Sequence, residues 1–130
     1  MSDLLFAYGT LLPGQSRWHH LQPLVVDEGV AVAVSGSLYD TGHGYPAAVF
    51  SHPGTIRGRV FRLQPDRVDQ ALQIIDEVER TADQNYRRVR IDADEHRSVW
   101  AYEYVGHDTM VSIAGGSWAE HVDTSQARRS

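Results

Sequence analysis

The sequence contains no cysteine, no lysine and no long apolar run. Without cysteine, the chain has no disulfide, thiolate metal site or cysteine nucleophile, and the redox state of its compartment stays open. No segment approaches the roughly 20 apolar residues that a membrane-spanning helix needs, and residues 1–3 lead into an apolar segment without the basic and apolar regions of a signal peptide. We therefore expect a cytoplasmic protein with no membrane partner.

Twelve arginines stand against 17 acidic residues, so the formal net charge is −5. A negative chain gives no overall reason to expect nucleic acid as a partner. A length of 130 residues fits one domain with one compact site. We predict a single domain over residues 1–123 and a polar, flexible tail over residues 124–130.

Apolar alternation predicts many strands and one strong helix. We expect strands at residues 4–8, 25–34, 36–39, 45–50, 56–63, 86–91 and 98–105. A short helix should follow Ser16, its N-cap, and a long helix should begin around Pro65 with Asp66 as N-cap and run to about Glu79. Such a mixture favours an α+β domain with a closed or strongly curved sheet.

The first strand leads directly into the turn Tyr8-Gly9-Thr10-Leu11. A glycine turn can direct backbone N–H groups at an anion or a carbonyl oxygen. A purely structural turn is the alternative, because many strands end at glycine.

The long helix carries a carboxylate on its apolar face. At about 100° per residue, Glu79 falls within roughly 40° of Val68, on the stripe that also holds Leu72 and Ile75. Glu77 falls on the solvent side and Asp76 on the flank. Burial raises the pKa of a glutamate and suits it to act as a general acid and base. Alternatively, the helix ends before Glu79, and the side chain enters solvent or pairs with Arg80, Arg87 or Arg88.

Other chemical motifs have weak support. The adjacent His19 and His20 lack the spacing of three or four residues that metal chelation on a helix needs. No Gly-x-Ser-x-Gly elbow, phosphate loop or dinucleotide fingerprint is present. Alternation in residues 86–90 favours a solvated edge strand with one inward arginine over a nucleic-acid patch. One face of a predicted strand carries Trp100, Tyr102 and Tyr104. These rings pack in the core, or, alternatively, Tyr102 or Tyr104 forms a pocket wall.

Several short motifs follow one another in a fixed order. They are Tyr8-Gly9-Thr10-Leu11, Ile75-Asp76-x-x-Glu79 and Tyr86-x-Arg88-x-x-Ile91, supported by Pro13-Gly14-Gln15, Tyr45-Pro46-Ala47 and Gly116-Ser117-Trp118. Over about residues 4–119, this combination resembles the gamma-glutamylcyclotransferase-like family, including its AIG2-like and gamma-glutamylamine cyclotransferase branches.

The resemblance implies a mixed, barrel-like sheet flanked by helices, with a cavity between the glycine turn and the helix that carries Glu79. It implies that Glu79 is the catalytic acid and base and that the backbone of Tyr8, Gly9, Thr10 and Leu11 holds a glutamyl group. One departure is Arg80, where relatives commonly have glycine. Arg80 either reshapes the end of the helix or pairs with the carboxylate, and it puts the activity in question.

The expected reaction is cyclotransfer on a small γ-glutamyl substrate, releasing 5-oxoproline and an amine without a metal or cofactor. Arg88 is a candidate for a second anion contact or for support of the loop at Glu79, and Tyr45 and Tyr102 are candidate pocket walls. The alternatives are a non-catalytic module that binds a small ligand or a partner protein, and an interaction protein in which Glu79 is simply salt-bridged. The sequence identifies neither the leaving amine nor the oligomeric state. We expect the loops at residues 35–45 and 81–85 to select the leaving amine.

Overall fold

The computed structural model describes residues 3–42, 44–82, 86–93, 96–106 and 110–122, with the backbone alone at residues 80–82. Its strands are β1 (Leu4–Ala7), β2 (Val30–Ser35), β3 (Ser37–Asp40), β4 (Pro46–Val49), β5 (Thr55–Arg62), β6 (Tyr86–Ala93), β7 (His96–Tyr104) and β8 (Val111–Ser112). Its helices are α1 (Trp18–Leu21), α2 (Val68–Ala82) and the short 3₁₀ turns η1 (Gln22–Leu24) and η2 (Pro65–Arg67). Residues 118–122 are also helical.

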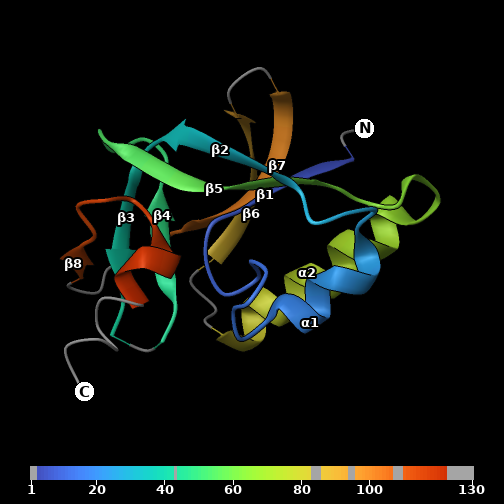
Figure 1. The fold of residues 1–130 in the computed structure, drawn as a ribbon, viewed down its shortest axis with the longest axis horizontal. Helices are drawn as coiled ribbons and strands as arrows, with labels where there is room; N and C mark the ends of the chain where they lie inside the picture. Colours follow the sequence, from blue (N-terminus) through green and yellow to red (C-terminus); the bar gives the residue numbers. More distant parts are fainter. Residues whose placement is uncertain (1–2, 43, 83–85, 94–95, 107–109, 123–130) are drawn as a thin grey trace.

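The strands form two sheets (Figure 1). The larger sheet has the order β2-β5-β1-β7-β6, and the smaller sheet has the order β4-β3-β8. Strand β1 pairs antiparallel with β5 and parallel with β7, so the larger sheet is mixed. The predicted α+β class with a mixed sheet and flanking helices is confirmed. The described strands do not close into one barrel, because β3, β4 and β8 separate into their own sheet.

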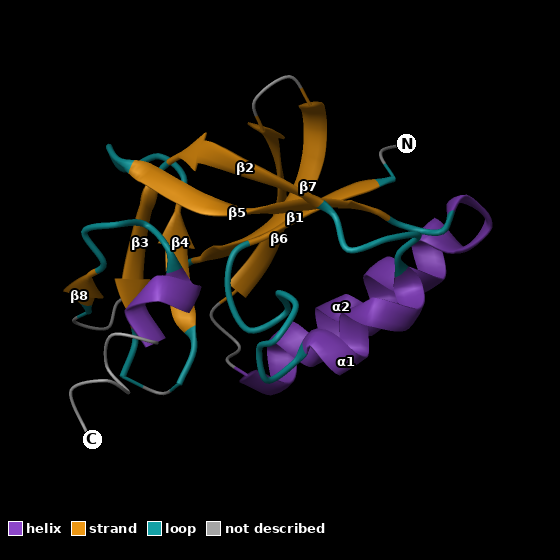
Figure 2. Ribbon diagram, viewed as in Figure 1, coloured by secondary structure: helices purple, strands orange, loops and turns teal. Residues whose placement is uncertain are grey.

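Helices α1 and α2 lie side by side at one end of the molecule, and the smaller sheet and residues 118–122 lie at the other (Figure 2). A hydrogen bond links the two sheets: the backbone N–H of Phe50, just after β4, donates to Oε2 of Glu103 on β7 at 3.0 Å. Among the described residues, no helix combines the length and the apolar character needed to cross a membrane.

Strand β1 is buried on both of its faces. Leu5 and Ala7 pack in a cluster with residues of α1 and α2, whereas Phe6 and Tyr8 pack in a second cluster with residues of β3, β4 and β7. A strand buried on both faces needs apolar residues in succession. The run at the start of the chain therefore places the turn after β1 in the interior, between the two clusters.

Several predicted boundaries were wrong. Strand β2 begins at Val30 instead of Val25, which makes only an isolated bridge with Leu63. Helix α1 has Arg17 at its N-cap position, with no side-chain cap. Asp66 lies inside η2 and is not an N-cap, since a 3₁₀ turn precedes α2. Helix α2 continues through Ala82, beyond the predicted end near Glu79. The predicted tail lies outside the described residues.

Candidate active site

The turn after β1 lies close to the start of β4. A Cβ atom on Gly9 would lie 2.6 Å from Cγ of Pro46, so only glycine fits without displacing the proline. The N–H of Leu12 donates to the carbonyl of Gly9 at 3.1 Å, and the N–H of Arg17 donates to the carbonyl of Thr10 at 2.7 Å. The turn carbonyls are therefore bonded within this segment. In the described chain, no backbone carbonyl accepts a hydrogen bond from the N–H groups of Gly9, Thr10 or Leu11.

A narrow cavity of about 30 Å³ lies beside this turn. This volume is well below the roughly 300–1,000 Å³ typical of small-molecule sites. The lining residues come from β1 and its turn, the start of β4, α2, β6 and β7: Phe6, Ala7, Tyr8, Gly9, Thr10, Leu11, Tyr45, Pro46, Glu79, Tyr86 and Tyr102. The cavity thus brings together segments from both ends of the chain.

Glu79 lies in this cavity, on the inner face of α2. Burial raises its pKa from 4.5 to about 7; Arg17 acts in the opposite direction, and Asp76 adds a smaller increase. Glu77 is exposed, and Asp76 is partly exposed on the flank, as the helical wheel predicted. The alternative in which the helix ends before Glu79 is wrong. Among described residues, no arginine lies within ion-pair distance of Glu79; the side chain of Arg80 lies outside the description.

Three tyrosines of the cavity wall are fixed by hydrogen bonds. The Tyr8 hydroxyl donates to the carbonyl of Tyr102 at 2.6 Å, and the Tyr102 hydroxyl donates to Oδ1 of Asp76 at 2.5 Å. The Tyr86 hydroxyl donates to the carbonyl of Pro46. Burial raises the pKa of both Tyr8 and Tyr102, so both hydroxyls remain protonated at neutral pH.

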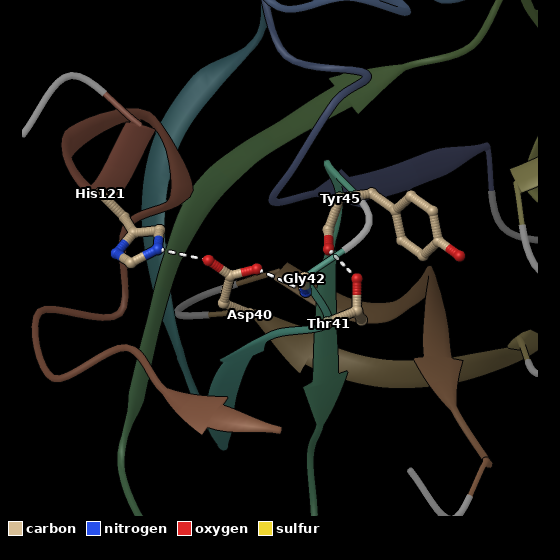
Figure 3. A network of polar contacts seen from close by, with 5 residues as sticks. All are labelled: Asp40, Thr41, Gly42, Tyr45 and His121. Carbon is tan, nitrogen blue, oxygen red and sulfur yellow. Dashed lines mark hydrogen bonds and ion pairs between the residues drawn. The ribbon is translucent and has the colours of Figure 1, made fainter. Parts of the chain in front are cut away.

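Tyr45 is held by the loop that follows β3 (Figure 3). The Thr41 hydroxyl donates to the carbonyl of Tyr45 at 2.7 Å, and Asp40 accepts a hydrogen bond from the N–H of Gly42 at 2.8 Å. Asp40 also pairs with Nε2 of His121 at 2.7 Å. Burial raises the pKa of Asp40, but the hydrogen bonds from His121 and Gly42 outweigh it and lower the pKa overall. These contacts connect the helical residues 118–122 to the loop that carries a cavity wall.

Arg88 does not line the cavity beside the glycine turn. Its Nη1 lies 3.5 Å from Oδ2 of Asp76, and its guanidinium carbon lies 4.8 Å from the ring centroid of Trp100. It lines an adjoining cavity, together with Asp76, Glu79, Tyr86, Arg87 and Tyr102. Its contact with Asp76 places Arg88 against α2, three residues before Glu79.

The sequence-based list of site residues missed Phe6, Ala7, Pro46 and Tyr86, which line the cavity, and Arg17, which lies beside it. Pro46 and Tyr86 stand in short motifs and were recognised there without a role. The guanidinium carbon of Arg17 lies 5.8 Å from the centroid of the Tyr45 ring. No local pattern distinguishes Arg17 from the other eleven arginines, because its position depends on the fold of residues 8–21.

No group of three or more histidine or acidic side chains could hold a metal ion within the described part of the chain. The rings of His19 and His20 lie 4.0 Å apart on α1, although neighbouring helical residues were expected to diverge. Both side chains are exposed. The pair has no third ligand among described residues.

Comparisons with known proteins agree on one family. The model of the family described as "Gamma-glutamyl cyclotransferase, AIG2-like" matches residues 5–120. A Vibrio cholerae protein described as "Putative gamma-glutamylcyclotransferase" is 30% identical over 123 residues, which cover 94% of this chain and 100% of that protein.

Solved structures share the fold at lower identity. An uncharacterized Pyrococcus horikoshii protein has a TM-score of 0.75 and 19% identity, with 97% of this chain and 98% of that chain covered. Kluyveromyces lactis allophanate hydrolase has a TM-score of 0.70 and 13% identity, with 95% of this chain but only 21% of that chain covered. The fold therefore also occurs as part of a much larger enzyme.

Proposed function

Because the chain belongs to the gamma-glutamyl cyclotransferase, AIG2-like family, we propose that it converts a γ-glutamyl amine into 5-oxoproline and a free amine. The observation that carries this proposal is that the carboxyl group of Glu79 lies in the cavity and that burial raises its pKa to about 7. A group with this pKa can both accept and donate a proton near neutral pH.

The reaction begins at the α-amino group of the substrate, which is an ammonium at neutral pH. Glu79 removes a proton, and the amine nitrogen attacks the γ-carbonyl carbon to form a new C–N bond in a five-membered ring. The carbonyl oxygen becomes an oxyanion in the tetrahedral intermediate. Glu79 then delivers its proton to the leaving nitrogen as the original C–N bond breaks. The regenerated carboxylate takes the second proton from the new ring nitrogen and passes it to the released amine, so the products are a neutral lactam and an ammonium.

The turn after β1 supplies the second element of the mechanism. The N–H groups of Gly9, Thr10 and Leu11 are available to an oxygen that gains negative charge, since no described backbone carbonyl accepts them. Preorganised donors of this kind stabilise an oxyanion without reorganising during the reaction. The tyrosine-lined walls favour a folded substrate in which the amine lies near its own carbonyl.

The test is release of 5-oxoproline from a panel of γ-glutamyl amines, γ-glutamyl amino acids and glutathione. We expect wild type to release it and Glu79→Gln to lose activity by at least about 100-fold, the usual contribution of a positioned acid and base. Glu77→Gln is the matched control, because it makes the same chemical change on the exposed side of α2 and should retain full activity.

The competing function is a binding module on the same fold. It predicts that a γ-glutamyl compound binds to folded wild type and is recovered intact, with Glu79→Gln altering binding alone. Full activity of Glu79→Gln would instead remove Glu79 from the mechanism. The substrate panel also tests which leaving amine the protein accepts. Of the two loops expected to select this amine, residue 43 of the first and residues 83–85 of the second lie outside the described residues.

A further inference from the structure

Arg17 is a partly exposed residue that places one buried guanidinium nitrogen beside the proposed site. Its Nη1 atom is buried and has no hydrogen-bond partner among the described residues. The backbone N–H of Arg17 donates to the carbonyl of Thr10 at 2.7 Å, so this residue is tied directly to the turn that lines the cavity. Its guanidinium group lies over the ring of Tyr45, another cavity wall.

A buried guanidinium N–H without a partner is costly, because it loses hydration and gains nothing in return. Glu79 is close enough for Arg17 to lower its pKa, yet the two groups do not form an ion pair within 4 Å. Burial outweighs Arg17 in setting the Glu79 pKa, so the carboxyl group is about half protonated near pH 7 and neutralises Arg17 only in part.

The pair of opposite charges matches the two ends of an amino-acid head group. A γ-glutamyl substrate carries an α-ammonium and an α-carboxylate on the same carbon. In the proposed reaction the ammonium must meet Glu79, which removes its proton. The carboxylate then needs a cation on a neighbouring wall, and Arg17 is the arginine that contacts both the turn and Tyr45.

Building on the proposed function, we propose that Arg17 binds the α-carboxylate of the γ-glutamyl substrate through its buried Nη1. This assignment reserves the backbone N–H groups of Gly9, Thr10 and Leu11 for the γ-carbonyl oxygen. A charge-assisted hydrogen bond between guanidinium and carboxylate is about twice as strong as a neutral one. Arg17 is thus the residue that selects a glutamyl head group over a chain with only the amine.

The experiment compares two substrates with the same leaving amine: the γ-glutamyl amide and the 4-aminobutanoyl amide, which lacks only the α-carboxylate and cyclises to 2-pyrrolidinone. We expect Arg17→Gln to lower kcat/KM for the γ-glutamyl amide by about 10- to 100-fold, the range for a lost hydrogen bond to a charged group. The 4-aminobutanoyl amide should change by less than about threefold. Arg67→Gln, an exposed arginine on η2, is the matched control and should behave as wild type.

Equal losses on both substrates would overturn the assignment, since Arg17 would then act through Glu79 and not on the carboxylate. No loss on either would overturn it as well. If Arg17→Gln does not fold, Arg17→Met retains the apolar stem over Tyr45 and carries the same expectation.

A binding measurement separates this assignment from the proposed function. Calorimetry with 5-oxoproline and 2-pyrrolidinone needs no turnover, and we expect wild type to prefer 5-oxoproline and Arg17→Gln to lose that preference. Suppose that wild type shows no turnover but prefers 5-oxoproline, and that Arg17→Gln loses this preference. That result would refute the proposed function and keep the assignment of Arg17. The assignment would be refuted if wild type turns over its substrate and Arg17→Gln still prefers 5-oxoproline. It would also be refuted if wild type shows no preference for 5-oxoproline.

Discussion

Replacing Glu79 by glutamine tests the environment of this carboxyl group by stability alone, independently of any substrate. The folded protein raises the pKa of Glu79 from 4.5 to about 7. At about 1.4 kcal/mol per pH unit, this change corresponds to a cost of about 3 kcal/mol for keeping the ionised carboxylate in the folded state.

The sign of the pH dependence follows from proton uptake. Between pH 4.5 and about 7 the folded state binds more protons at Glu79 than the unfolded state does, so the free energy of unfolding falls as pH rises. The cost is absent below this window and complete above it. Glutamine does not ionise, so Glu79→Gln should exceed wild type in stability by about 1 kcal/mol at pH 5, about 2 at pH 6 and about 3 at pH 8.

Urea unfolding of both proteins at these three pH values gives the difference directly, and other titrating groups cancel in it. Glu77→Gln should stay within about 0.5 kcal/mol of wild type at each pH, as an exposed substitution. A stability gap for Glu79→Gln that is zero, reversed or independent of pH would refute the reasoning. In that case the carboxylate is hydrated or ion-paired in the folded state.

Two further substitutions test the surroundings of Glu79 and the turn. Asp76→Asn removes a charge that raises the Glu79 pKa, so the acidic limb of the kcat/KM profile should move to lower pH. The lost pair with the partly exposed Arg88 should cost less than about 1 kcal/mol of stability. A pH profile whose acidic limb does not move would contradict this prediction. Gly9→Ala forces a Cβ atom against Pro46 and should destabilise the protein by about 1–3 kcal/mol in urea unfolding. In the control Gly115→Ala, the new Cβ would have no atom nearer than 3.8 Å, so stability should change by under about 0.5 kcal/mol. Equal effects of the two substitutions would show that the close approach to Pro46 is not the constraint.

The features predicted correctly from the sequence depend on contacts close in sequence. The face of α2 that holds Glu79 follows from the helical period alone, because Val68, Leu72 and Ile75 recur at the spacing of one buried stripe. The burial of β1 on both faces follows from an uninterrupted apolar run. Motif order also identified the family that the comparisons support.

Two of the features that sequence analysis missed depend on contacts distant in sequence. Separation of β3, β4 and β8 into a second sheet depends on pairing between residues more than 70 positions apart, such as Tyr39 and Ser112. The position of Arg17 beside Tyr45 depends on how the turn after β1 meets the start of β4. The extension of α2 to Ala82 reflects the general uncertainty of helix ends.

The proposed chemistry requires that Glu79 be neither fully paired nor fully isolated. A direct ion pair with Arg17 would lower its pKa and leave a poor base, whereas burial without any cation would raise the pKa and keep the group protonated. In the structure burial dominates, Arg17 opposes it and Asp76 adds to it, and the pKa is about 7. Asp76 is itself held by Tyr102 and Arg88, so these two residues fix the position of the charge that raises the Glu79 pKa. A change at Arg17 or Asp76 should therefore shift the pH dependence of the proposed turnover.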